Sequence, residues 1–133
     1  MPRLTDEAAR LLQEPNFATV ATLNPDGSSQ LSIVWIDWDG KDVLFNTAAG
    51  RAKPRNLERD PRLSVLVVDR QDGYRWVGVR GIAEMTTDGA DEHIDKLAKK
   101  YLGLDEYPYR APDERRVIIR IRPERVFSFG VDA

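Results

Sequence analysis

The sequence predicts a mainly β fold in which about seven antiparallel strands close into a barrel, accompanied by three short helices. Segments rich in Val, Ile, Thr and aromatic residues follow one another closely along the chain. Most are joined by short turn sequences such as NPDG, WDGK and RQDG, and such connections pair strands antiparallel because parallel pairing needs a long crossover. The length and the hydrophobic fraction of 41% suit one folded domain spanning residues 1–133.

The segment 5–14, TDEAARLLQE, predicts the first helix. Thr5 is a favourable N-cap, acidic residues occupy the first turn, and the apolar residues share one face. Pro15 ends the helix.

Segments 17–23 (FATVATL) and 28–38 (SSQLSIVWIDW) predict a hairpin around the NPDG turn. In the second of these strands, large apolar side chains occur at both odd and even positions. We therefore expect both of its faces to be covered. The WDGK turn leads to a third strand, 42–48 (DVLFNTA), which runs directly into a basic segment.

The basic segment predicts the start of the second helix. Pro54 lacks an N–H group and is harmless only in a first turn, so the helix should begin at about Arg51 to Lys53. Arg51, Lys53 and Arg55 then lie at a terminus that already favours an anion, and each exposed cation there is disfavoured by ~0.3 to 1 kcal/mol. We expect a phosphate or carboxylate site, with a merely solvated basic face as the alternative.

Two further cations of this segment, Arg59 and Arg62, lie beyond the first turn of the helix. We expect them to be surface residues paired with Glu58 or Asp60.

Two more strands follow at 63–69 (LSVLVVD) and 74–86 (YRWVGVRGIAEMT). Gly78 and Gly81, inside the longer strand, predict a bulge or a close approach of another segment.

The C-terminal part predicts the third helix and the last two strands. Segment 87–103 has helical apolar spacing, and a polar loop, 104–114, follows it. Segments 115–123 and 124–132 predict two closing strands separated at Pro123.

The residue types argue against nucleophilic and transition-metal chemistry. The chain has no Cys, and its one His is His93, beside Glu92 and off the apolar stripe of the third helix. We expect His93 to face solvent, which excludes a Ser-His-Asp arrangement and leaves too few ligands for zinc or iron. No catalytic side chain and no metal ligand is predicted.

Other polar and aromatic residues have a functional and a structural interpretation. Asp37 and Asp39 lie in the DWDG turn, where local backbone hydrogen bonding is a better explanation than acid-base chemistry. Trp35, Tyr74 and Trp76 could stack on a planar ligand, but aromatic residues in strands more often belong to a core or an interface.

The net charge and the hydropathy pattern argue against nucleic acid as a partner and against secretion or a membrane location. A net charge of −2 and a pI near 5.5 argue against general nucleic-acid binding. The N-terminal stretch carries acidic residues within its apolar pattern, unlike a signal peptide, and no apolar run is long enough to span a membrane. We expect a cytoplasmic protein.

Three stretches together resemble one known family: FATVATLNPDGSSQLSIVW, FNTAAGRAKPRNLERDPRLSVLVVD and GYRWVGVRGIAEM. They resemble the split β-barrel flavin and deazaflavin oxidoreductases, which are related to pyridoxamine 5'-phosphate oxidase and include FMN-binding proteins. The GRAKxRNLxRDPR form is closest to the branch that uses the deazaflavin coenzyme F420. The resemblance spans nearly the whole chain and implies a homodimer of split β-barrels with cofactors between the subunits.

The resemblance also implies a set of cofactor-binding residues. Those beside the ring would be Gln30, Ser32 and Val34. Those around the phosphate-bearing tail would be Thr47, Arg51, Ala52, Lys53, Arg55 and Asn56. Those contributed by the partner subunit would be Trp76, Val77 and Arg80. Pro54 departs from the family pattern, which usually has a residue with a backbone N–H there.

The implied activity is hydride transfer between coenzyme F420 and a conjugated or heterocyclic small molecule, with the protein supplying orientation and electrostatics. Arg116 is a further candidate, for holding an acidic substrate. The alternatives are an FMN oxidoreductase of the pyridoxamine 5'-phosphate oxidase type and a non-catalytic protein that binds a planar cofactor. Single-stranded nucleic acid binding would need basic and aromatic residues interleaved on one sheet face.

Overall fold

The computed structural model describes residues 3–133 and contains six strands that close into one barrel, with three helices outside it. The strands are β1 (Phe17–Leu23), β2 (Ser29–Trp38), β3 (Val43–Ala48), β4 (Arg62–Asp69), β5 (Asp72–Thr86) and β6 (Arg116–Phe129). All pairings are antiparallel, in the closed order β1-β2-β3-β6-β5-β4. The predicted barrel is confirmed.

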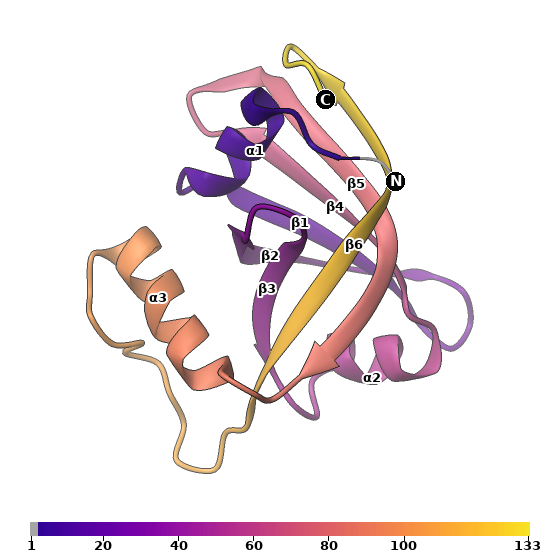
Figure 1. Ribbon diagram of the computed structural model, residues 1–133. Coiled ribbons are helices and arrows are strands. Elements are labelled where there is room, and N and C mark those ends of the chain that lie inside the picture. Colours follow the sequence, from indigo (N-terminus) through magenta and orange to yellow (C-terminus); the bar gives the residue numbers. More distant parts are fainter. Residues whose placement is uncertain (1–2) are drawn as a thin grey trace.

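The helices are α1 (Asp6–Gln13), α2 (Ala52–Arg59) and α3 (Ala90–Leu102). Thr5 caps α1 as predicted, its side chain accepting from the N–H of Ala8. Figure 1 shows α1 and α2 at opposite ends of the barrel and α3 beside β2 and β3. No helix within residues 3–133 combines the length and the apolar character needed to cross a membrane.

The barrel interior is filled by apolar side chains from every strand. The chief fully buried ones are Val20, Ile36, Phe45, Val67, Val77 and Ile119. Their burial follows from the period-2 alternation of the strands, since one face of each strand points inward.

The count of six strands corrects the expected seven. No break occurs at Pro123, which lies within β6 opposite Gly81, where the pairing of β5 with β6 shifts register. A proline without N–H is tolerated at such an irregularity, so the two predicted closing strands are one. A Cβ at Gly81 would lie 2.2 Å from the carbonyl oxygen of Arg122, which confirms the predicted close approach.

β2 and β3 pair over only a short stretch of the barrel wall. Only three residue pairs join these strands, Ile36–Phe45, Asp37–Leu44 and Trp38–Val43, and the preceding part of β2 pairs with β1 alone. The wall therefore splits beside the first half of β2. The candidate site lies at this split.

The outer face of the sheet carries a cross-strand row that contains exposed apolar side chains. Ile33, Thr19, Leu66, Gly78 and Phe127 are successive neighbours across β2, β1, β4, β5 and β6. Ile33 is 69% exposed, so the expectation that both faces of β2 are covered is wrong for the single chain. We call this row, with the exposed Leu31 beside it, the outer apolar face.

Candidate functional site

A pocket of about 210 Å³ opens at the split between β2 and β3. β2 and β3 form one wall, and the start of α2, α3 and the segment after α3 form the others. The side chains that the following argument uses are Val34, Asn46, Thr47, Arg51, Lys53 and Arg116. Sites for small organic ligands typically enclose ~300 to 1,000 Å³, so this chain supplies only part of the enclosure for a ligand with several rings.

The positive end of α2 forms one side of the pocket. Gly50 has a φ of +89°, a conformation that favours glycine, and it turns the chain so that Arg51 becomes the N-cap. The Arg51 side chain makes no capping hydrogen bond, and the first turn contains no acidic residue. Pro54 lies in this first turn, as predicted, which leaves Ala52 and Lys53 as the residues whose N–H groups can serve an anion there.

Two cations from this terminus line the pocket. Arg51 is largely exposed and lies 4.0 Å from the carboxylate of Glu114, at the limit of an ion pair. Lys53 is partly buried, and its burial, followed by the charge of Arg51, lowers its pKa. An anionic group bound here would offset both effects, because it would supply a partner charge that no carboxylate of residues 3–133 provides to Lys53.

Among residues 3–133, two buried hydroxyl groups have no hydrogen-bond partner. Thr47 is 1% exposed and lines the pocket, yet its Oγ1 bonds to no protein group. The Oγ of Ser32, on the inward-facing row of β2, is likewise unpaired. Unpaired buried hydroxyls are costly, so the Thr47 hydroxyl, which lines the pocket, fits a site that a polar ligand completes.

Three predicted residues lie on one row of β2. Gln30, Ser32 and Val34 pair with Thr22, Val20 and Ala18 of β1, a row whose members point into the barrel. Of the three, Val34 reaches the pocket.

The remaining residues predicted around the anionic tail lie outside the pocket lining. Ala52 and Arg55 are exposed. Asn56 is 4% exposed, and its amide group donates to Thr22 Oγ1 at 3.0 Å and to Asn24 Oδ1 at 3.1 Å. The Asn56 side chain thus ties α2 to the β1–β2 hairpin.

The two distal arginines of the basic segment behave differently from each other. Arg62 pairs with Asp60 at 2.7 Å, as expected. Arg59 instead donates to Asn56 Oδ1 and to the carbonyl of Leu23, so its predicted pairing with Glu58 or Asp60 is wrong. The cause is the position of Arg59 beside the β1–β2 turn, where carbonyl and amide oxygens are nearer acceptors.

The β5 residues predicted to act across a subunit interface are remote from this pocket. Val77 is fully buried in the barrel. Trp76 stacks on Phe129, and Arg80 lies 5.3 Å from the ring centroid of Phe127, on the outer side of the sheet. One chain therefore brings Val34, Thr47, Arg51 and Lys53 together, but not the β5 residues.

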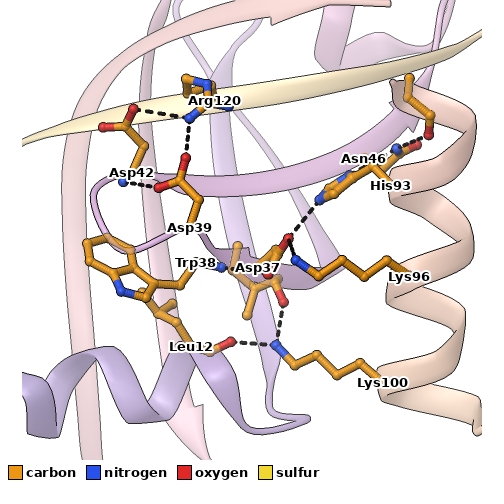
Figure 2. A network of polar contacts seen from close by, with 12 residues as sticks. Leu12, Asp37, Trp38, Asp39, Asp42, Asn46, His93, Lys96, Lys100 and Arg120 are labelled. Atoms are coloured by element: carbon orange, nitrogen blue, oxygen red, sulfur yellow. Dashed lines mark hydrogen bonds and ion pairs between the residues drawn. The ribbon is translucent and has the colours of Figure 1, made fainter. Parts of the chain in front are cut away.

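The expectation that His93 faces solvent is wrong. Its side chain is 8% exposed and lies between Asp37 and Asn46 (Figure 2), with His93 Nε2 3.0 Å from Asp37 Oδ2 and Nδ1 3.2 Å from Asn46 Nδ2. α3 packs its His93 side against β2 and β3, so polar partners from both strands replace water. Sequence spacing alone placed this residue off the apolar stripe and could not reveal those partners.

Asp37 makes the predicted local backbone hydrogen bond, accepting from the N–H of Trp38 at 2.8 Å, but it also has side-chain partners in α3. Asp39 accepts from the N–H groups of Lys41 and Asp42, as a turn residue does, whereas Asp37 is buried. Burial alone would raise the pKa of Asp37, but hydrogen bonds from His93 and from the N–H of Trp38, with the charge of Lys96, lower it to about 2.

Arg116 is held tightly in the pocket wall. It is 4% exposed, donates from Nε to Asn46 Oδ1 at 2.8 Å, pairs with Glu114 and lies 5.1 Å from the centroid of the Tyr107 ring. Burial lowers its pKa. Much of its donor capacity is engaged by the protein itself, which weakens its candidacy as a free anchor for an acidic substrate.

Sequence reasoning missed Asn46, Tyr107 and Tyr109 as pocket residues. The two tyrosines lie in the loop after α3, and their shared feature in sequence is only the YPY spacing. Within residues 3–133, no three His, Cys, Asp or Glu side chains lie close enough together to hold a metal ion.

The sequence and the structure were compared with protein families, curated proteins and solved structures, and the matches point to one family. The sequence model described as pyridoxamine 5'-phosphate oxidase matches residues 4–130. A curated F420H(2)-dependent biliverdin reductase from Mycobacterium tuberculosis (strain CDC 1551 / Oshkosh) is 31% identical over 129 residues, covering 95% of this chain and 88% of that protein. A pyridoxine/pyridoxamine 5'-phosphate oxidase from Kineococcus radiotolerans is 37% identical over 71 residues, covering 53% of this chain and 31% of that one. A solved structure described as an F420 reductase superposes with a TM-score of 0.81 at 31% identity, covering 93% of this chain and 98% of the other.

Proposed function

Because the chain belongs to the pyridoxamine 5'-phosphate oxidase family, we propose that it is an oxidoreductase that uses coenzyme F420 to exchange a hydride with a conjugated or heterocyclic small molecule. One observation supports the proposal most directly. Arg51, Lys53 and the unpaired Thr47 hydroxyl all line one pocket at the start of α2. These groups suit the phosphate of the cofactor tail.

In this proposal the chain's own residues bind and orient. Arg51, Lys53 and the first-turn N–H groups would hold the anionic tail, and Gln30, Ser32 and Val34 would lie beside the ring. Arg55, Ala52 and Asn56 would act at the edge of the tail site. The bound cofactor supplies or accepts the hydride, so no acid, base or nucleophile from the chain is required.

We further propose that the protein works as a homodimer. The pocket is small for a cofactor with several rings, and Trp76 and Arg80 lie on the outer side of the sheet, where they could complete a site on a second copy. The outer apolar face supports this arrangement, because exposed apolar patches of this kind usually mark interfaces.

The experiment is a spectral titration of the purified protein with coenzyme F420 and, separately, with FMN. We expect F420 fluorescence and absorbance to change at micromolar concentration and FMN to bind more weakly. Absence of any change with F420 contradicts the proposal.

The second candidate function is an FMN oxidoreductase of the pyridoxamine 5'-phosphate oxidase type, favoured by the Kineococcus radiotolerans relative. A yellow preparation that releases FMN on denaturation favours this candidate. Binding of F420 without turnover of any substrate in a panel favours a cofactor-binding protein that is not an enzyme.

A further inference from the structure

Four buried side chains behind and in the pocket wall, with the exposed Lys96 at one end, form a continuous hydrogen-bonded chain. It runs from Lys96 and Asp37 through His93 and Asn46 to Arg116 (Figure 2 shows it up to Asn46). Asn46 and Arg116 line the pocket, whereas Asp37 and His93 lie behind it. The proposed hydride transfer uses none of these residues.

Two contacts of Asn46, with the carbonyl of Ala90 and with Arg116 Nε, each fix which end of its amide group is the nitrogen and which the oxygen. One amide atom lies 2.8 Å from the carbonyl oxygen of Ala90, so it must be the donating nitrogen. The other lies 2.8 Å from Arg116 Nε, which can only donate, so it must be the oxygen. Asn46 therefore presents an N–H to His93.

The two partners of His93 then select one protonation state. Nδ1 faces the Asn46 amide nitrogen at 3.2 Å and must accept, so it carries no proton. Nε2 faces the carboxylate of Asp37 at 3.0 Å and must donate. The ring is the neutral Nε2–H tautomer, and the alternative tautomer would set two donors against each other at Asn46 and two acceptors against each other at Asp37.

We propose that His93 is a positioning residue of the pocket: held by Asp37 in the Nε2–H form, it accepts the second N–H of the Asn46 amide and, together with the carbonyl of Ala90, keeps Asn46 Oδ1 on the Arg116 guanidinium in the pocket wall. The consequence for binding rests on the proposed function, because it takes this pocket to be the cofactor site. The orientation of Arg116 itself can be measured without any ligand.

The first test uses the fact that His93 is the single histidine of the chain. In a protein labelled with ¹⁵N, every imidazole signal belongs to it. At neutral pH we expect one protonated nitrogen, Nε2, and one bare nitrogen, Nδ1. A protonated Nδ1, alone or together with Nε2, overturns the proposal in the unaltered protein.

The second test separates the two sides of the ring. In His93→Asn the side-chain oxygen can replace Nδ1 as the acceptor for Asn46, whereas in His93→Gln the amide nitrogen can replace Nε2 as the donor to Asp37. The solvent exchange rate of the Arg116 Nε–H reports whether Asn46 still holds the guanidinium. We expect slow exchange in the wild type and in His93→Asn, and faster exchange in His93→Gln.

The affinity for coenzyme F420 should follow the same order. Loss of one positioning hydrogen bond in His93→Gln should weaken binding about fivefold to tenfold, and His93→Asn should stay near the wild type. Glu92→Gln, on the exposed neighbouring residue of α3, is the matched control and should change neither quantity.

The outcomes distinguish this inference from the proposed function. Equal Arg116 exchange rates in His93→Asn and His93→Gln, or losses that follow only the melting temperature, overturn the positioning role. If the wild type does not bind F420, the proposed function fails, and the exchange rates still decide whether His93 positions Arg116.

Discussion

The hydroxyl of Thr47 lines the pocket at 1% exposure and has no hydrogen-bond partner in the part of the chain that the structure describes. An unpaired buried hydroxyl costs about 1 to 3 kcal/mol, which a ligand that hydrogen-bonds to it would recover. Lys53 is also incompletely satisfied. Burial lowers its pKa, and no carboxylate of residues 3–133 forms an ion pair with it. Both residues are destabilising in the free chain and favourable for a bound anion.

Lys53→Ala should therefore weaken binding of coenzyme F420 by about tenfold or more, since charge-assisted hydrogen bonds contribute ~1.5 to 3 kcal/mol. The melting temperature should stay the same or rise, because an unfavourable cation is removed from a helix N-terminus. Spectral titration and thermal unfolding measure the two effects.

Arg55→Ala is the comparison within the same helix turn. Arg55 is exposed and outside the pocket lining, so its loss should have a smaller effect than the loss of Lys53. Unchanged F420 affinity in Lys53→Ala would remove the anion site from the proposed function.

Asp37 makes the stability of the protein depend on pH in the acid range. Its hydrogen bonds and the charge of Lys96 overcome the effect of burial and lower its pKa to about 2, from 3.8 in a free chain. A carboxyl group whose pKa is lower in the folded state contributes stability above the unfolded value and loses it as the pH falls from about 4 to about 2. The contribution at neutral pH is about 2 kcal/mol by this linkage.

In Asp37→Asn, the free energy of unfolding should be lower than in the wild type at pH 7, and the gap should narrow as the pH falls from 4 to 2. Urea denaturation at a series of pH values measures it. Asp88→Asn, at an exposed position, serves as the control. A gap that stays constant with pH would show that Asp37 is not the linked group.

At the scale of the elements, the β5–β6 pair depends on two glycines with different neighbours. A Cβ at Gly81 would meet the backbone oxygen of Arg122 at 2.2 Å, whereas a Cβ at Gly78 would meet the ring of Phe127 at 2.3 Å. A backbone atom in a paired strand cannot move aside without breaking the ladder. A partly exposed ring can rotate away.

Gly81→Ala should consequently destabilise the fold more than Gly78→Ala, by about 1 to 3 kcal/mol, the usual cost of overpacking. Gly73→Ala is a control, since its Cβ would meet nothing within 4 Å. Chemical denaturation gives the three values, and equal losses at Gly78 and Gly81 would contradict the reasoning.

The elements were largely predictable because they depend on local signals. Thr5, Pro54 and the strand alternation act within a few residues, so the cap of α1, the start of α2 and the strands of the barrel follow from them. Pro123 was misleading because its tolerance depends on Gly81, some forty positions away, which creates the irregularity that accommodates it.

The candidate site was predictable only in part, for the same reason. The cations at the start of α2 could be identified from Pro54 alone. His93 is buried because it has polar partners on two strands, Asp37 on β2 and Asn46 on β3. The residue spacing within α3 cannot reveal partners from other elements.

At the scale of the whole molecule, the outer apolar face exposes large apolar side chains that a partner would cover. Ile33 at 69% and Leu31 at 62% exposure lie on the same strand, and Leu66 and Phe127 continue the surface across the sheet. Burying this face against a second copy would remove the cost of its contact with water.

Ile33→Asp should convert the proposed homodimer into a monomer while leaving the barrel folded, because the side chain points away from the core. Sedimentation measures the mass, and circular dichroism reports the retained strands. Asp26→Asn, in the exposed β1–β2 turn, is a control that should stay dimeric. A wild type that sediments as a monomer at micromolar concentration would refute the dimer directly.

The segment between α3 and β6 contributes Tyr107 and Tyr109 to the pocket without adding a residue pair to any strand ladder. Side-chain contacts hold it in place: Asp95 receives the N–H of Tyr107 and the guanidinium of Arg110, and Tyr107 packs edge-on against Trp35. The lining of the pocket can therefore change in this segment without any change in the strand pairing of the barrel. Exchange of residues 104–113 with those of a relative should alter the affinity for coenzyme F420, measured by spectral titration, while circular dichroism shows the strands retained.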